Sequence, residues 1–226
     1  MNLQKLFEMQ AQLDADITAH HPVQEGENRL EKKVLALLVE LGECAQEWRG
    51  FKFWSNRQTA NELEWINEDC KSCKGTGVDV EGVALGNPYP CIECEGKSVV
   101  AYSKNPLIEE YVDCLHFILS IGNEKVPYLE HQAPIHLELP FGSELEKTLY
   151  KDATTQFVYL FNIISIFADT LMENEVTLMS EAFDEYTEMF KAFLGLGELL
   201  GFTDGQIEQA YYDKNKVNFK RQEQGY

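Results

Sequence analysis

Apolar residues recur every three or four positions along most of this chain, which is the spacing of amphipathic helices. The pattern starts near the N-terminus, is interrupted by two irregular stretches, and then resumes up to the C-terminus. It predicts an all-α protein, a bundle whose helices span residues 2–19, 30–50, 107–122, 143–171, 174–200 and 203–222.

Short signals mark the connections between these helices. Three prolines interrupt residues 123–142, so we expect a loop there. Gly201 suits the C-terminal end of one helix, and Thr203 suits the N-cap of the next. We also expect a short helix at residues 61–68.

Residues 70–97 break the helical pattern and form a small insert in a domain that comprises residues 1–69 and 98–226. The segment contains four cysteines, five glycines and two prolines. Its cysteines form two Cys-x-x-Cys pairs separated by seventeen residues, the spacing of a structural zinc site in which four thiolates surround one ion. We therefore expect a zinc-ribbon-like unit whose ligands are Cys70, Cys73, Cys91 and Cys94.

The zinc unit has two candidate roles. A structural staple is expected, because so short a segment buries too little apolar surface to fold alone. A ribbon that binds nucleic acid or a protein partner is the alternative. The basic residues of the unit, Lys71, Lys74 and Lys97, are outnumbered by acidic ones, which favours the staple. Cys44 and Cys114 lie in predicted helices and are expected to be buried free thiols.

Two apolar helical segments carry acidic residues at helical spacing. VLALLVELGEC contains Glu40 and Glu43, and EEYVDCLHFILSIG contains Glu110 and Asp113. Residues three apart share a helix face, so these helices could converge four carboxylates. Solvated surface pairs are the common alternative, but a helix that is apolar all round is normally buried, and buried carboxylates need compensation. Because neither segment contains Lys or Arg, we expect Mg²⁺ or Mn²⁺ to bind there.

Composition and charge narrow the function further. The 226 residues include 19 Lys and Arg against 38 Asp and Glu, a formal charge of −19, which argues against binding to nucleic acid or to anionic membranes. The most apolar run, residues 157–167, is shorter than the ~20 residues of a membrane span, and we expect no signal peptide. A cytoplasmic location with reduced cysteines is expected.

A protein this acidic can still bind phosphates if divalent cations lie between the negative partners. The C-terminal helix also offers a locally basic face, since Lys214, Asn218 and Arg221 are spaced four and then three residues apart. A solvated basic face is the alternative for this segment alone. Together with the carboxylates, it becomes a candidate phosphate clamp.

Four motifs follow one another along the chain. They are Leu6-Phe7-Glu8-Met9-Gln10 with Leu13-Asp14; Leu37-Leu38-Val39-Glu40-Leu41-Gly42-Glu43 followed by Phe51-Lys52-Phe53-Trp54-Ser55; Glu110-Tyr111-Val112-Asp113-Cys114-Leu115-His116-Phe117 with Leu119-Ser120-Ile121-Gly122; and Lys214, Asn218, Arg221, Gln222, Gly225 and Tyr226. In this order they resemble the all-α dimeric dUTPases of the MazG-like nucleotide pyrophosphohydrolase superfamily, over most of the chain outside the cysteine unit.

The resemblance implies Mg²⁺-dependent hydrolysis of dUTP to dUMP and pyrophosphate, with dUDP as a further candidate substrate. It implies a homodimer that builds each active site from both subunits. The resemblance assigns metal binding to Glu40, Glu43, Glu110 and Asp113, and we favour Glu40 as the residue that activates water. Nucleotide binding falls to Gln10 with Phe53 or Trp54 for uracil, His116 and Phe117 beside the deoxyribose, and Lys214, Asn218 and Arg221 for the phosphates.

Two alternatives remain open. Some relatives have asparagine where this chain has Asp14, which leaves dCTP or a broader set of dNTPs as substrates of a pyrophosphatase. A non-enzymatic zinc-ribbon interaction protein, whose acidic helices are only scaffold, is the alternative from a different class. That alternative does not explain the charged residues inside VLALLVELGEC.

Overall fold

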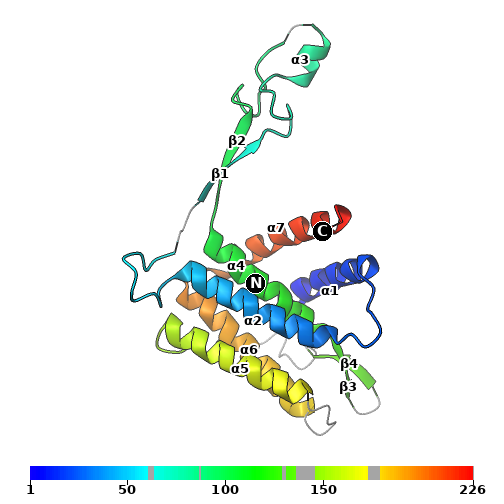
Figure 1. Cartoon of the computed structure of the whole chain (residues 1–226), viewed down its shortest axis with the longest axis vertical. Coiled ribbons are helices and arrows are strands. Elements are labelled where there is room, and N and C mark those ends of the chain that lie inside the picture. The colour runs from blue at the N-terminus through cyan, green and yellow to red at the C-terminus, as the bar shows by residue number, and fades with distance from the viewer. Residues whose placement is uncertain (61–63, 87, 129–130, 136–145, 173–178, 226) are drawn as a thin grey trace. The chain divides into compact units, whose positions relative to one another are not determined.

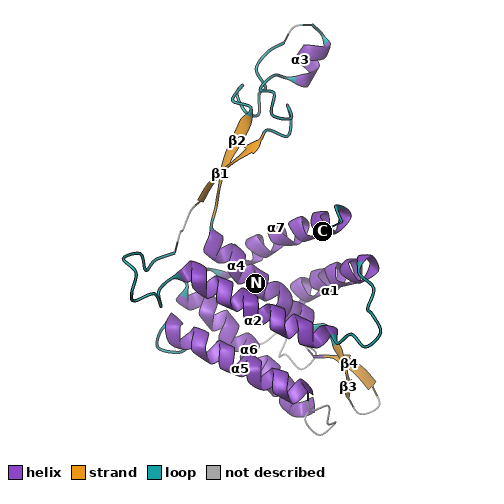
Figure 2. Cartoon of the chain, viewed as in Figure 1, coloured by secondary structure: helices purple, strands orange, loops and turns teal. Residues whose placement is uncertain are grey.

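The computed structural model describes residues 1–60, 64–86, 88–128, 131–135, 146–172 and 179–225. The chain divides into two compact units, a helical unit of Met1–Ala60 with Leu107–Tyr226, and a second unit of Asn61–Pro106 (Figure 1). Helices account for most of the first unit (Figure 2). The predicted all-α class is confirmed.

Long helices build the first unit. They are α1 (Leu3–His20), α2 (Arg29–Trp48), α4 (Pro106–Gly122), α5 (Ala153–Met172), α6 (Met179–Leu199) and α7 (Asp204–Glu223). Helix α5 packs against α6, α1 against α7, and α2 against α5. Helix α4 runs through the interior, with eleven of its seventeen residues buried. The first three helices and the last two lie close to their predicted positions.

Two buried tyrosines attach α4 to α6. The Tyr111 hydroxyl donates a hydrogen bond to the Phe193 carbonyl at 3.0 Å, and the Tyr186 hydroxyl donates to the Ile118 carbonyl at 2.9 Å. The Tyr111 ring also stacks on Phe193, with 4.3 Å between ring centroids. Because these hydroxyls are buried, losing either bond would leave a polar group unsatisfied. The bonds therefore hold α4 against α6.

Helix α5 begins later than predicted, at Ala153 and not at residue 143. The Asp152 carboxylate accepts hydrogen bonds from the Thr155 amide at 2.8 Å and from its hydroxyl at 2.9 Å, which caps the helix at this point. The buried Gln156 side chain donates to the carbonyls of Thr148 and Ala192. These bonds keep the preceding segment extended over α6. Residues 143–145 lie outside the described residues.

The expected signals at the last two helices are confirmed. Gly201 has φ +84° two residues after the last residue of α6, a conformation that glycine adopts at low cost. Thr203 forms a capping box with Gln206 at the start of α7. The predicted start of α6, at residues 174–178, lies outside the described residues.

Two predictions of local structure are wrong. Residues 64–68 belong to strand β1 (Glu64–Asp69), which pairs antiparallel with β2 (Val99–Lys104), and residues 61–63 lie outside the described residues. The predicted loop contains a hairpin of β3 (Lys125–Tyr128) and β4 (His131–Pro134). A strand needs a partner that local sequence does not reveal, and a two-stranded hairpin tolerates proline because each strand is an edge. Residues 136–142 lie outside the described residues.

Helix α5 is long and apolar enough to cross a membrane by length and composition alone. Its Leu160, Ile164 and Phe167 side chains are buried in the core of the helical unit. Val158 and Ile166, by contrast, are 65% and 42% exposed. One side of α5 therefore belongs to the core, and the other side offers apolar surface.

We predict that Gly122→Ala destabilises the helical unit. A methyl group on Gly122 would overlap the Tyr186 hydroxyl and the Phe7 ring, and overpacking of this kind costs about 1–3 kcal/mol. Urea denaturation would measure the loss. Gly205→Ala is the matched control, since a methyl group there meets no atom within 4 Å. Equal stability of both variants would contradict the packing described here.

Candidate functional site

A pocket of about 1040 Å³ lies among α1, α2, α4 and α7 of the helical unit. Most of the residues predicted to act on a nucleotide line it: Gln10, Glu40, Asp113, His116, Phe117, Asn218 and Arg221. Asp14, Lys33, Ser120 and Glu124, which were not predicted as site residues, also line it. Residues from opposite ends of the chain therefore meet in one cavity.

Three of the predicted carboxylates form a cluster where α2 and α4 face each other. One oxygen from each of Glu40, Glu43 and Glu110 lies within 4.8 Å of the others. Glu40 and Glu110 are half-buried, and Glu43 is exposed. Asp113, one turn after Glu110 on α4, lies close enough to act electrostatically on Glu40 and Glu110. The spacing on the two helices thus brings three of the four predicted acids together, with Asp113 beside them.

The surroundings of the cluster disfavour negative charge. Burial and the charges of Asp113, Glu43 and Glu110 raise the pKa of Glu40 to about 7. Burial and the same kind of repulsion raise the pKa of Glu110. Carboxylate oxygens this close together are the hard donors that Mg²⁺ and Mn²⁺ take. The donor set therefore fits a divalent cation.

Helix α7 brings positive charge to this cluster. Lys214 donates a hydrogen bond from its Nζ to Asp113, which opposes the effect of burial on the pKa of Asp113, although that pKa remains raised. Asn218 and Arg221 follow at the next turns and line the pocket, and the Arg221 guanidinium donates to the Asn218 side chain at 3.4 Å. The predicted basic face thus adjoins the acids.

A second group of polar side chains lies deeper in the pocket. The Gln10 side-chain oxygen is 2.8 Å from His116 Nδ1 and accepts from the Tyr211 hydroxyl at 2.9 Å. Asp14 accepts from Gln10 and from Ser120, and Lys33 pairs with Asp14 and Glu124. Ser120 could have been identified from the sequence, because it lies one helical turn after His116 in the same motif of α4.

Phe53 and Trp54 lie outside this pocket. Their rings contact each other at 5.0 Å between centroids, and their side chains are 83% and 66% exposed. A single chain therefore does not bring these two predicted uracil contacts to Gln10. Leu35 and Val39 on α2 are also exposed, so this helix is not buried on all sides, as its composition suggested.

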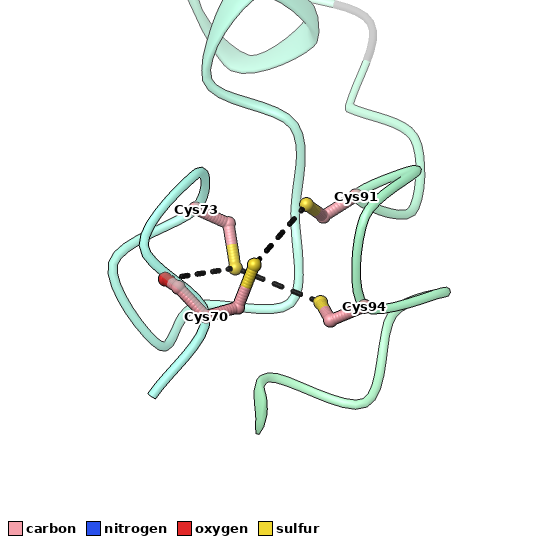
Figure 3. A group of neighbouring side chains, drawn as sticks. All are labelled: Cys70, Cys73, Cys91 and Cys94. Atoms are coloured by element: carbon pink, nitrogen blue, oxygen red, sulfur yellow. Dashed lines mark hydrogen bonds between the residues drawn. The ribbon is translucent and has the colours of Figure 1, made fainter. Parts of the chain in front are cut away.

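The four cysteines of the second unit surround one point (Figure 3). All four are buried, and their sulfurs lie within 4.8 Å of one another. Cys70 Sγ to Cys91 Sγ and Cys73 Sγ to Cys94 Sγ both measure 3.8 Å. Zinc–sulfur bonds of about 2.3 Å in a regular tetrahedron imply edges of about 3.8 Å between sulfurs. The cluster therefore has the dimensions of a four-thiolate zinc site.

The backbone around the cysteines is arranged twice in the same way. Gly75 and Gly96 each donate an amide hydrogen bond to the carbonyl of the first cysteine in the preceding pair, Cys70 and Cys91 respectively. Both glycines have positive φ, as the tight turns require. Cys44 and Cys114 are buried free thiols, as predicted.

The chain matches a known protein family. A family model described as dUTPase matches residues 2–70 and 97–226. The matched segments contain all the residues of the pocket, whereas Cys73, Cys91 and Cys94 fall outside them. Searches of curated proteins and of solved structures returned no match.

We predict that Cys73→Ser abolishes zinc binding by the purified chain. A serine hydroxyl is a poor replacement for the thiolate that zinc prefers, and three sulfurs cannot complete the tetrahedron. Elemental analysis should give one zinc per wild-type chain and little in the variant. Ser72→Ala, an exposed change in the same turn, should retain zinc. Unchanged zinc in Cys73→Ser would contradict the four-thiolate site.

We predict that the metal-free protein loses stability as pH rises, in part through Glu40. Its folded pKa is raised from 4.5 to about 7, so its favourable contribution is complete below about pH 4.5 and is lost as pH rises through 7. Thermal denaturation in EDTA should show a smaller fall in Tm between pH 5 and 8 for Glu40→Gln than for wild type.

Added Mg²⁺ should raise the Tm of wild type at pH 8, because the cation binds the ionised cluster. Glu8→Gln, an exposed change on α1, should follow the wild-type curve. Identical pH profiles for wild type and Glu40→Gln would show that Glu40 is not electrostatically strained.

Proposed function

The chain belongs to the dUTPase family and is, at that level, a dUTP-hydrolysing enzyme; we propose that it is an Mg²⁺-dependent dUTP diphosphatase that produces dUMP and pyrophosphate. The observation that carries the proposal is the cluster of Glu40, Glu43 and Glu110, with Asp113 and Lys214 beside it, at one end of a nucleotide-sized pocket. Acids packed this tightly are unfavourable unless they are protonated or cations compensate them.

Glu40, Glu43, Glu110 and Asp113 are the residues that would hold the cation. Mg²⁺, or Mn²⁺ in its place, would supply the positive charge that polarises the phosphate chain. Four carboxylates provide oxygen ligands of the kind such ions take and leave positions for substrate phosphates. The repulsion that raises the pKa of Glu40 and Glu110 is relieved by the same ion.

Glu40 is the residue we favour to orient and deprotonate the attacking water. A carboxylate whose pKa is raised to about 7 can accept a proton near neutral pH. The water oxygen forms a bond to a phosphorus of the anhydride that joins the α- and β-phosphates, and its proton passes to Glu40. The bond from that phosphorus to the bridging oxygen breaks, and dUMP and pyrophosphate separate. Lys214 and Arg221 are placed to compensate the charge on the phosphates, with Asn218 between them on the same face of α7.

The deeper part of the pocket would hold the nucleoside. Gln10 and His116 offer hydrogen-bonding groups, and Phe117 offers an aromatic face, as the resemblance implies. A 2′-hydroxyl would be excluded by close packing against His116 and Phe117. Asp14 beside Gln10 keeps dCTP, or a broader set of dNTPs, as the alternative substrate.

A homodimer would complete the site. Leu35 and Val39 on α2, and Val158 on α5, are exposed apolar side chains on helices that pack against each other. Exposed apolar surface of this kind is typical of protein interfaces. Phe53 and Trp54, which lie outside the pocket of their own chain, could then reach the uracil bound by a partner subunit.

We also propose that Cys70, Cys73, Cys91 and Cys94 bind a structural zinc ion. The sulfur spacing supports it, and the small apolar content of the insert explains why a staple is needed. Six free cysteines are compatible with a cytoplasmic location, where thiols stay reduced. The family match argues against the alternative of a non-enzymatic zinc-ribbon interaction protein.

Pyrophosphate release from a panel of nucleotides tests the proposal. With Mg²⁺, we expect dUTP to be cleaved far faster than dCTP, dTTP or UTP, and we expect EDTA to stop the reaction. Faster cleavage of dCTP would favour the alternative substrate. No turnover of any nucleotide would favour the interaction protein.

Glu43→Gln should lower kcat for dUTP by about a hundredfold or more, because it removes a ligand of an ion that contributes several kcal/mol to the transition state. Glu43 is exposed, so the fold should persist. Glu31→Gln, an exposed acid of the same helix that does not line the pocket, should keep wild-type activity. Full activity in Glu43→Gln would refute the metal assignment.

A further inference from the structure

Three buried side chains from α1, α4 and α7 form a small polar group at the inner wall of the pocket. Gln10 is 3% exposed, His116 is 6% exposed, and Tyr211 is fully buried. The imidazole of His116 stacks on the Tyr211 ring, with 4.3 Å between centroids, which fixes the plane of the imidazole. In the orientation that the structure shows, what each ring nitrogen can donate or accept depends on which of them carries the proton.

Asp14 sets the direction of the hydrogen bonds in this group. Its carboxylate accepts from the Ser120 hydroxyl at 2.9 Å on each oxygen, and Lys33 Nζ lies 3.9 Å away. Burial raises the pKa of Asp14, and the charge of Lys33 together with the bonds from Gln10 and Ser120 opposes that effect. In its ionised form beside Lys33, the carboxylate can only accept. The Gln10 amide nitrogen, 2.8 Å from Asp14 Oδ1, must therefore donate to it. The Gln10 side-chain oxygen is then turned toward His116 and Tyr211.

That orientation decides the tautomer of His116. The Gln10 oxygen accepts from the Tyr211 hydroxyl and lies 2.8 Å from His116 Nδ1, so Nδ1 must carry the proton. Burial, with the nearby charge of Lys214, lowers the pKa of His116 to about 3, so the ring is neutral and has only this proton. Nε2 is left as a bare acceptor, and it is buried without a hydrogen-bond partner among the described residues.

We propose that Asp14, Gln10 and Tyr211 are positioning residues that hold His116 in the Nδ1–H tautomer, so that Nε2 accepts a hydrogen bond from the 3′-hydroxyl of the bound nucleotide. The assignment of the donor rests on the proposed function. A buried acceptor with no partner in the protein is costly, and His116 lines the substrate pocket. A donor brought by the ligand satisfies it.

The position of His116 along α4 indicates which part of the nucleotide it meets. It follows Asp113 by three residues, a rise of about 4.5 Å on the same face. The sugar is the part of a nucleotide next to the phosphate that the acids would hold. In a 2′-deoxynucleoside 5′-triphosphate, the 3′-hydroxyl is the sugar's one hydrogen-bond donor. Ser120 lies one turn further along α4, where it is hydrogen-bonded to Asp14 of α1.

The tautomer can be measured in the free protein by long-range ¹H–¹⁵N NMR of the histidine ring. Wild-type His116 should show a protonated Nδ1 and a bare Nε2 at neutral pH. Asp14→Asn should raise the population with Nε2 protonated, because an amide at position 14 lets Gln10 turn its NH₂ group toward His116. Asp16→Asn, on the same helix but outside the network, should leave the spectrum of His116 unchanged.

A protonated Nε2 in wild type, or no change in Asp14→Asn, would overturn the proposal that Asp14, Gln10 and Tyr211 set the tautomer of His116. This measurement needs no substrate and no activity. It therefore distinguishes a wrong tautomer assignment from a failure of the proposed dUTP hydrolysis.

The donor is tested by comparing dUTP with its 3′-deoxy analogue. Wild type should show kcat/KM on the order of tenfold lower for the analogue, the usual worth of one buried hydrogen bond. His116→Phe keeps a ring against Tyr211 but removes the acceptor, so it should treat the two nucleotides alike. His116→Gln, whose side-chain oxygen can replace Nε2, should restore part of the preference.

Equal use of the two nucleotides by wild type would overturn the 3′-hydroxyl as donor. If dCTP proves to be the substrate, the same comparison is made with dCTP and its 3′-deoxy analogue, since the sugar is unchanged. If no nucleotide is cleaved, the Nε2 resonance is followed on adding α,β-imido-dUTP with Mg²⁺. A shift with this compound and none with its 3′-deoxy form supports the proposal, and equal responses overturn it.

Discussion

Three carboxylates meet where α2 faces α4, and the repulsion among them is the constraint on which the functional half of this structure depends. Glu40, Glu43 and Glu110 bring oxygens within 4.8 Å of one another while partly withdrawn from water. Lys214 is hydrogen-bonded to the neighbouring Asp113, and its charge only partly opposes the effects that raise the pKa of Glu40 and Glu110. A fold that holds such a group together must oppose this repulsion through its packing, and it would gain stability from the cation that we propose.

Helix α4 holds these groups in place because one of its sides is buried in the core while the other side faces the pocket. Tyr111, Leu115 and Ile118 are buried in the core, and Tyr111 is bonded directly to α6. Asp113 and His116 lie on the pocket side. The packing of this one helix therefore fixes the positions of both the proposed metal ligand Asp113 and the proposed nucleoside contact His116. In the proposed tautomer, the packing around His116 also determines the position of one proton. The ring can accept a hydrogen bond from a hydroxyl only if its neighbours keep the proton on Nδ1 and leave Nε2 unprotonated.

The second unit follows a separate physical rule. Its core cluster consists of the four cysteines, with Val100 packed against them, which is far too little apolar surface to order a chain segment. Metal binding and folding are expected to be coupled there. The helical unit, with its large apolar core, needs no such crosslink, which explains how a family fold can carry this insertion between two of its motifs.

The sequence by itself determined the helices, the cysteine cluster and the convergence of the acids, because these depend on spacing along one element. Helical periodicity placed Glu40 beside Glu43, and two Cys-x-x-Cys pairs implied a single site. Only the tertiary structure decided that Asp152 starts α5, that β1 pairs with β2, and that Phe53 and Trp54 lie outside the pocket of their own chain. It also joined Asp14, Gln10 and Tyr211 to His116. Those outcomes depend on contacts between segments as much as two hundred residues apart, which no local pattern records.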